Sequence, residues 1–244
     1  MRTATQPSYS RRKQRLHGRR FFRASEAYVL VRGKFADDPR GRFGRLAKRA
    51  FDIAVSAVAI VVLAPVFLLL GLLVALESGW PVFFGHRRVG KHGRIFKCWK
   101  FRTMRKDAEE ILRNDPDLYD VYVANNYKLP LELDPRVTRV GRFLRKTSLD
   151  ELPQFFNVLV GDMSLVGPRP VIPEELEWYG EKAGEFLSVR PGITGRWQVM
   201  GRSRIGYPER VEVELDGIRR GSFWSDLVVL LQTVRAVWTA RGSL

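Results

Sequence analysis

The sequence contains little cysteine and histidine, and its first residues lack the apolar core of a secretory signal. Cys98 is the only cysteine among 244 residues, which excludes an intrachain disulfide and a metal site built from several cysteines. His86 and His92 have no ligand-type partners at a regular spacing, so we interpret them as surface or turn residues. Residues 1–44 hold no apolar run of signal-peptide length, and we expect no secretory signal there.

Acidic residues are also scarce relative to basic ones. The chain has 42 Lys and Arg against 26 Asp and Glu, a formal net charge of +16. This excess favours polyanionic partners, either nucleic acid or the anionic lipids of a membrane surface. Residues 1–46 carry runs of basic side chains, which we interpret as a basic N-terminal arm, either directed at an acidic surface or simply solvated. Residues 25–34 could form one short strand within it.

One long apolar run, Ile53–Leu76, lies between the charged residues Asp52 and Glu77. Its length is sufficient for a helix to cross a bilayer. However, Pro65 near its middle removes a helical hydrogen bond, and both flanks carry the Lys and Arg excess typical of the cytoplasmic side. We therefore predict that residues 47–78 form a re-entrant membrane helix broken at Pro65. A single straight span and a soluble core helix are the alternatives.

The rest of the chain alternates between strand-like and helix-like patterns. Residues 80–104 predict a β-hairpin with a glycine-containing turn at 90–93. Residues 105–126 predict a charged surface helix interrupted by a proline, and residues 174–189 another helix. Residues 223–238 are apolar and too short for a span, which favours an amphipathic helix at a membrane interface or an ordinary core helix.

Two adjacent carboxylates, Asp150 and Glu151, form the best candidate for catalysis. Ser148 followed by Glu151 fits a capping box, so we expect a helix to begin here and its N-terminus to keep Asp150 ionised. An ionised aspartate beside a second acid, with Arg145 just upstream, suits attack on a phosphorus atom. Paired carboxylates also suit Mg²⁺. A plain helix cap is the alternative interpretation.

Two stiff turns follow, each carrying an arginine. Residues 167–170 read Gly-Pro-Arg-Pro and residues 190–195 read Arg-Pro-Gly-Ile-Thr-Gly. Proline and glycine fix the direction of such turns, and their free backbone amides can hold a diphosphate or a sugar. The alternative is that these turns only terminate the elements before them.

The segment SLDELPQFFNVLVGDMSLVGPRP resembles the signature of the bacterial sugar transferase family, the polyprenyl-phosphate hexose-1-phosphate transferases with one membrane-embedded catalytic domain. Further segments agree with that family in order, from about residue 48 to the C-terminus. FFGHRRVG and FKCWKFRTM are most similar to the branch that starts exopolysaccharide repeat units with galactose 1-phosphate or glucose 1-phosphate. The other matching segments are KRAFDIAVSAVAIVVLAPVFLLL, DPRVTRVGRFLRKTSLDELPQ, RPGITGRWQVMGR and FWSDLVVLLQT.

This resemblance implies a two-step phosphosugar transfer. Asp150 attacks the β-phosphorus of a UDP-hexose and releases UMP, and undecaprenyl phosphate then takes the hexose 1-phosphate from Asp150. Mg²⁺ is the implied cofactor, with Asp150 and Glu151 as its ligands; Glu151 could equally orient groups or act as an acid or base. The implied phosphate- and substrate-binding residues are Lys100, Arg145, Arg169, Arg190 and Asp216.

The predicted fold class is α+β and mostly helical: a monotopic membrane protein with a re-entrant helix broken by proline, a small β-hairpin and amphipathic interfacial helices. Residues 79–244 form the catalytic domain on the cytoplasmic face. We expect a bacterial inner (cytoplasmic) membrane location, with both termini cytoplasmic. The expected partners are UDP-hexose, undecaprenyl phosphate and anionic membrane lipids, with no nucleic acid; a homo-oligomer is compatible with the sequence.

Two other functions compete with this interpretation. A basic, membrane-tethered nucleic-acid-binding or adaptor protein explains the charge, but not the adjacent acids or the two arginine-bearing turns, and the sequence has no recognisable nucleic-acid motif. Hydrolysis of a diphosphate by the same carboxylates is the third possibility.

Overall fold

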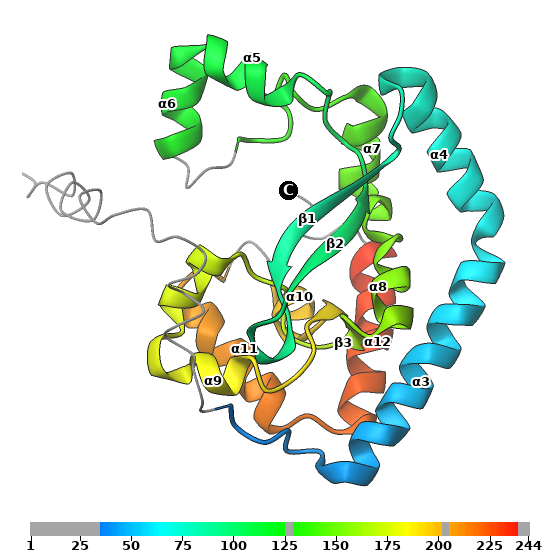
Figure 1. Cartoon of the computed structure of the whole chain (residues 1–244), viewed down its shortest axis with the longest axis vertical. Coiled ribbons are helices and arrows are strands. Elements are labelled where there is room, and N and C mark those ends of the chain that lie inside the picture. Colours follow the sequence, from blue (N-terminus) through cyan, green and yellow to red (C-terminus); the bar gives the residue numbers. More distant parts are fainter. Residues whose placement is uncertain (1–34, 125–128, 202–204, 239–244) are drawn as a thin grey trace, which may run out of the picture.

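The computed structural model describes residues 35–124, 129–201 and 205–238. The possible strand at 25–34 and most of the basic arm lie outside these ranges. Most described residues are helical, and a small antiparallel hairpin lies near the centre (Figure 1).

The α-helices are α3 (Gly41–Val62), α4 (Ala64–Ser78), α5 (Ala108–Asn114), α6 (Pro116–Ala124), α7 (Arg139–Thr147), α8 (Gln154–Val160), α9 (Ala183–Phe186), α10 (Arg196–Met200), α11 (Glu209–Arg219) and α12 (Phe223–Trp238). The 3-10 helices are η1 (Lys91–Gly93), η2 (Leu149–Glu151), η3 (Pro173–Trp178) and η4 (Gly180–Lys182), and the strands are β1 (Phe83–Val89), β2 (Ile95–Phe101), β3 (Ser164–Val166) and β4 (Gly192–Thr194).

The long apolar run forms two helices with a bend between them. α3 ends at Val62, and α4 begins at Ala64 with Pro65 in its first turn. The two helices are bent by 63°, because proline removes a backbone N–H and its ring clashes with the preceding turn. No single helix among the described residues is long and apolar enough to cross a membrane, whereas the bent pair passes that test of length and composition together. In Figure 1 the pair runs along one side of the molecule.

The predicted hairpin is confirmed. β1 and β2 pair antiparallel over seven residue pairs, from Phe83 opposite Phe101 to Val89 opposite Ile95. The turn between them contains η1, where His92 adopts a left-handed conformation. Along β2 the buried Phe96 and Cys98 alternate with the exposed Lys97 and Trp99, and the buried Phe101 ends this alternation at the last residue of the strand.

The predicted capping box at Ser148 is wrong. Ser148 has a left-handed backbone conformation that closes α7, and its side chain makes no capping hydrogen bond to the following turn. Asp150 and Glu151 lie in the short 3-10 helix η2, whereas α8 begins only at Gln154. Pro153 explains the difference: it has no N–H to continue a hydrogen-bonded helix from η2, so the α-helix begins after it.

The two stiff turns predicted separately lie side by side. β3 and β4 pair in parallel, with Ser164 opposite Gly192 and Val166 opposite Thr194. A Cβ added to Gly192 would lie 2.1 Å from the backbone nitrogen of Gly167, so only glycine allows this close approach.

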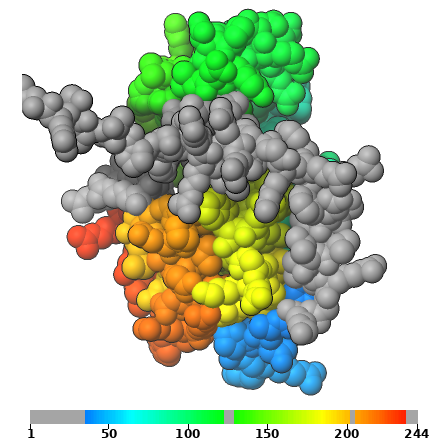
Figure 2. All heavy atoms as spheres, turned by 90° about the vertical axis from the view of Figure 1, so that its left-hand side faces the viewer, coloured from blue at the N-terminus to red at the C-terminus, as the bar shows by residue number. Residues whose placement is uncertain are grey.

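The two other predicted helical regions have different outcomes. α5 ends at Asn114 and α6 begins at Pro116, which confirms an interruption at the proline. Residues 174–189, by contrast, form a series of short turns, η3, η4 and α9, and not one helix. Gly180, with a φ of 49°, breaks the helical pattern there. Figure 2 shows α5 and α6 at one end of the molecule and the start of α3 at the other.

Helix α12 has one packed face and one exposed face. Val229 is buried in a core cluster with Phe96, Val158 and Met163. Trp224 is 73% exposed, and Val228, Leu231 and Val234 are also exposed, at helical spacing from it. The helix therefore packs one face on the core and presents an apolar outer face, and its location at a membrane interface stays a prediction.

A second cluster attaches the bent pair to the elements that carry the candidate site. Leu70 and Val74 of α4 pack with Phe101 of β2 and Leu144 of α7. Lys100 and Arg145 are the sequence neighbours of Phe101 and Leu144, so this core fixes their positions relative to α4.

Candidate active site

Lys100 of β2 lies between the two carboxylates. Its Nζ is 3.2 Å from Oδ2 of Asp150 and 2.7 Å from Oε1 of Glu151. Asp150 is buried, whereas the side chains of Lys100 and Glu151 are 26% and 24% exposed. The cluster therefore opens to the surface next to Lys100 and Glu151.

Asn157 of α8 fixes the helix to the strand. Its Oδ1 accepts a hydrogen bond from the Trp99 backbone N–H at 2.9 Å, and its Nδ2 donates to the Lys97 carbonyl at 2.8 Å. Asn157 is fully buried. Because Lys100 follows Trp99 directly and η2 leads into α8, these two bonds set the distance between the lysine and the carboxylates.

Arg145, in the last turn of α7, supplies a second cation near Asp150. Its Nε donates to Oγ1 of Thr103 at 2.9 Å, and its charge acts to lower the pKa of Asp150. The start of α7 is held by Glu77 of α4, whose carboxylate accepts hydrogen bonds from the backbone N–H groups of Arg139 and Val140 at 2.7 and 2.9 Å. The end of the bent helix pair is thus bonded to the helix that carries Arg145.

Arg169, in the Gly-Pro-Arg-Pro turn, reaches the cluster from the other side. Its Nη1 lies 4.0 Å from Oε1 of Glu151, and its guanidinium lies 5.8 Å from the ring centre of Trp197. Its backbone N–H donates to Oε1 of the buried Glu214 at 3.3 Å. The structure therefore brings Lys100, Arg145, Asp150, Glu151 and Arg169 together.

Burial raises the pKa of Asp150 above its ordinary value. Lys100 and Arg145 act in the opposite direction, and the Glu151 carboxylate adds to the increase. The expectation that a helix N-terminus keeps Asp150 ionised therefore fails, because Asp150 does not lie in the first turn of α8. Its ionisation depends on the two neighbouring cations.

Lys100 keeps its positive charge. Burial lowers its pKa, but the carboxylates of Glu151 and Asp150 outweigh that effect, so the pKa of Lys100 lies above its ordinary value. A lysine in this state can bind a phosphate oxygen as a point charge, and it is not suited to act as a base.

Arg190 and Asp216 are fixed by other contacts. The Nε of Arg190 donates to the Gly161 carbonyl at 2.8 Å, at the C-terminal end of α8. Asp216 of α11 forms ion pairs with Arg196 at 2.9 Å and Arg220 at 2.7 Å. The substrate contacts expected of these two residues stay predictions.

Asp150 and Glu151 also form the candidate magnesium site. Oδ2 of Asp150 and Oε1 of Glu151 both contact the Lys100 Nζ, at 3.2 and 2.7 Å, so the lysine ammonium occupies the point between these two oxygens and a metal ion would have to bind the other carboxylate oxygens. Mg²⁺ is usually held by one or two carboxylates plus substrate phosphate oxygens, and this pair fits that donor set. In the described part of the chain, no group of three His, Cys, Asp or Glu side chains could hold a metal ion. A Mg²⁺ ion here would need further oxygens from substrate or water.

Several residues that shape the site were not singled out in the sequence. Asn157 stands among the apolar residues 155–160, and a lone amide on a buried helix is a usable signal because it needs hydrogen-bond partners. Glu214, next to the buried Leu215, is a signal of the same kind. Thr103 and Glu77 gave no such signal, because both act through contacts between segments far apart in the sequence.

The chain is similar to known proteins over most of its length. Residues 43–240 match the family model described as bacterial sugar transferase. The chain is 46% identical over 204 residues to the exopolysaccharide production protein ExoY of Rhizobium meliloti, which covers 82% of this chain and 89% of that protein. Over 206 residues it is 43% identical to the undecaprenyl-phosphate galactose phosphotransferase of Salmonella typhimurium, covering 83% of this chain and 42% of that relative. It is 40% identical to the UDP-glucose:undecaprenyl-phosphate glucose-1-phosphate transferase of Escherichia coli over 206 residues, 81% of this chain and 41% of that relative. These matches show that the chain is an enzyme of the bacterial sugar transferase family.

Proposed function

We propose that the protein transfers hexose 1-phosphate from a UDP-hexose to undecaprenyl phosphate and so starts the assembly of an exopolysaccharide repeat unit. The observation that carries this proposal is the buried Asp150 held against Lys100, with Arg145 and Arg169 close by. The relatives support the chemistry through their names, which specify undecaprenyl phosphate together with galactose or glucose 1-phosphate transfer. Galactose and glucose are accordingly the proposed sugars, with galactose favoured.

In the first step, a carboxylate oxygen of Asp150 attacks the β-phosphorus of the UDP-hexose. A new bond forms between this oxygen and the phosphorus, the bond to the bridging oxygen breaks, and UMP leaves with that oxygen and its electron pair. Lys100, Arg145 and Arg169 stabilise the negative charge on the moving phosphoryl group, which is the main contribution a protein makes to such transfers.

In the second step, a phosphate oxygen of undecaprenyl phosphate attacks the same phosphorus. The bond between phosphorus and the Asp150 oxygen breaks, and the carboxylate is regenerated. The product is a polyprenyl diphosphate sugar. Lys100 can serve both steps, because it acts as a cation and its raised pKa favours the charged form.

Mg²⁺, held by Asp150 and Glu151 together with substrate oxygens, would neutralise part of the diphosphate charge when bound. Glu151 has a second role in this account, since its contact with Lys100 orients the lysine toward Asp150.

The acceptor is a lipid, and the bent helix pair gives the site a membrane setting. The exposed side chains of α4 before Glu77 are apolar, including Leu68 at 76%, Leu72 at 55% and Leu76 at 75%. We propose that α3 and α4 enter and leave the bilayer from the cytoplasmic face of the inner membrane, with both termini cytoplasmic. Because α4 packs on the elements that carry Lys100 and Arg145, this arrangement would place the site beside the lipid phosphate without a membrane-spanning helix.

The test is UMP release from UDP-galactose, UDP-glucose and a panel of other UDP-sugars by membrane fractions, with and without undecaprenyl phosphate and Mg²⁺. The wild-type protein should release UMP and form the lipid product with UDP-galactose or UDP-glucose. Asp150→Asn should lower both by at least about 10³-fold, because it removes the nucleophile and leaves the fold. Normal turnover by this variant would exclude Asp150 as the nucleophile. Release of free sugar phosphate without polyprenol would indicate hydrolysis instead.

A further inference from the structure

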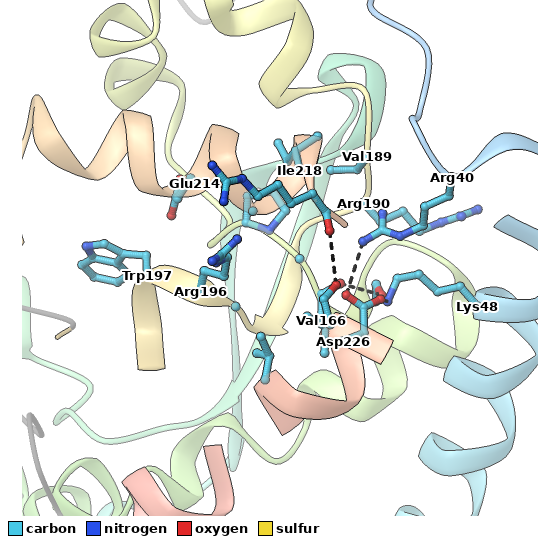
Figure 3. Close-up of a pocket in the computed structure, with 18 of the residues that line it drawn as sticks. Arg40, Lys48, Val166, Val189, Arg190, Arg196, Trp197, Glu214, Ile218 and Asp226 are labelled. Atoms are coloured by element: carbon cyan, nitrogen blue, oxygen red, sulfur yellow. Dashed lines mark hydrogen bonds and ion pairs between the residues drawn. The ribbon is translucent and has the colours of Figure 1, made fainter. Parts of the chain in front are cut away.

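A large basic cavity lies apart from the carboxylates. It has a volume of about 540 Å³, within the range of small-molecule sites, and lies between the first turns of α3, the β3–β4 pair, α10, α11 and α12. Figure 3 shows Arg40, Lys48 and Arg190 on one side and Trp197 and Glu214 on the other. The described lining includes eight basic and four acidic side chains, so the cavity is strongly electropositive.

The lining carboxylates compensate only some of these cations. Asp226 accepts from Lys48 at 2.8 Å and from Arg40 at 3.4 Å. By contrast, Arg45, Lys91 and Arg190 form no ion pair with any described carboxylate. Burial lowers the pKa of Lys91, the Asp38 carboxylate acts to raise it, and Arg190 and Arg45 are close enough to lower it further. One nearby carboxylate does not balance three cations, and such an excess of positive charge favours a bound anion.

Gln198 is a second, independent sign of a ligand. Its side chain is buried, at 8% exposure, and lines the cavity. Neither its Nε2 nor its Oε1 has a hydrogen-bond partner among the described residues. A buried amide with both ends unpaired is costly, and a ligand that offers one acceptor and one donor would satisfy it.

The cavity borders the catalytic cluster but does not contain its carboxylates. Of the described residues that line it, none is Lys100, Asp150 or Glu151, whereas Trp197 and Glu214, which contact Arg169, do line it. Its uncompensated cation Arg190 bonds to the C-terminal end of α8, whereas the carboxylates precede the N-terminal end of that helix. A ligand whose phosphates lie against Lys91 and Arg190 would therefore not present them to Asp150.

We propose that this cavity binds a second, non-reacting phosphate ester, with its phosphates at Arg45, Lys91 and Arg190 and its uncharged polar part at Gln198. Two sources share this chemistry: a soluble nucleotide, and the headgroup of an anionic phospholipid. The site goes beyond the proposed transfer reaction, and its binding can be measured without turnover.

The test is calorimetric titration of the purified full chain, in nanodiscs of zwitterionic phosphatidylcholine, with pyrophosphate, UMP and GMP. Arg45→Gln/Lys91→Gln should weaken pyrophosphate and nucleotide binding at least tenfold. The matched control Lys106→Gln/Arg113→Gln removes two exposed cations outside the cavity and should leave binding unchanged. Gln198→Leu should weaken the binding of UMP and GMP and leave the affinity for pyrophosphate unchanged, because pyrophosphate has no uncharged part. The same variant should raise the melting temperature, since it removes the unpaired amide, and this reports that it folds.

Further measurements test whether the site is separate from Asp150 and whether its ligand is a nucleotide or a lipid headgroup. Asp150→Asn should keep the pyrophosphate affinity, so a failure of the transfer mechanism and a failure of this proposal give different results. The site would be assigned to a lipid headgroup by two results together. Nanodiscs of phosphatidylglycerol should abolish pyrophosphate binding to the wild type. Native mass spectrometry should show phosphatidylglycerol retained by the wild type and lost from Arg45→Gln/Lys91→Gln. Absence of both pyrophosphate and phosphatidylglycerol binding would overturn the proposal. Equal affinities in the wild type and Arg45→Gln/Lys91→Gln, or loss of binding in Asp150→Asn alone, would also overturn it.

Discussion

At the scale of single residues, the chemistry depends on the charges that surround one buried carboxyl group. Burial raises the pKa of Asp150, Lys100 lowers it, and Glu151 raises it. A nucleophile needs the ionised form, so activity is lost as the pH falls through this pKa. The two neighbours of Asp150 therefore control the acid limb of the pH profile in opposite directions.

Two substitutions test this balance. Lys100→Met removes the charge that favours ionised Asp150, so the acid limb of kcat should move to higher pH, and kcat at its plateau should fall by about 10²–10³-fold. Glu151→Gln removes the charge that opposes ionisation, so the acid limb should move to lower pH. The measurement is kcat against pH for both variants and the wild type. Shifts of both variants in the same direction would contradict the assigned electrostatics.

The sequence pointed to Asp150, Glu151 and Lys100, because adjacent acids and a motif lysine are visible without a structure. It did not indicate the protonation preference of Asp150, since burial by segments distant in the sequence determines that preference. The sequence also did not indicate a role for Thr103, because its contact with Arg145 joins residues 42 positions apart.

At the scale of elements, α8 and β2 act as one support for the site. Asn157 makes both of the side-chain hydrogen bonds that join them. The hairpin was predictable because its alternation and turn are local. The start of α8 was not, because the Ser148–Glu151 pattern of a capping box competes with Pro153, and the proline determines where the helix begins.

Asn157→Leu tests this support. It leaves the Trp99 N–H and the Lys97 carbonyl without their partner and should reduce the free energy of unfolding by about 1–3 kcal/mol. Activity should fall as well, because Lys100 is then no longer fixed against the carboxylates. Asn157→Asp keeps the acceptor for Trp99 but buries a carboxylate against the Lys97 carbonyl, so it should also be destabilising. Denaturant unfolding and initial rates measure both quantities, and full activity of Asn157→Leu would show that the support is dispensable.

Pro65→Ala tests the bent pair. Alanine restores the backbone N–H, so the helix should straighten and some chains should insert with their ends on opposite sides of the membrane. Cysteines placed near each end report the sides through a membrane-impermeant thiol reagent. Cys98 contributes little background, because it is 2% exposed and burial raises the pKa of its thiol to about 11. Labelling of the two wild-type ends on opposite sides would refute the re-entrant arrangement.

At the scale of the whole molecule, contacts between distant segments hold the bent pair, the hairpin and the C-terminal helix around one site. Lys48 of α3 pairs with Asp226 of α12, and Arg49 donates to the carbonyls of Val158 and Leu159 at the end of α8. Such contacts were not readable from the sequence, which is also why the basic cavity that they border was not foreseen. The order of the motifs, by contrast, was enough to indicate the family.

The most direct test of the whole account is intact-protein mass spectrometry of the enzyme mixed with UDP-galactose or UDP-glucose and Mg²⁺ in the absence of undecaprenyl phosphate, then quenched rapidly. The account predicts a mass increase of one hexose phosphate, mapped to Asp150 by peptide analysis, absent from Asp150→Asn and removed when undecaprenyl phosphate is added. Lipid product formed at the normal rate with no adduct at any time, or an adduct on another residue, would contradict it.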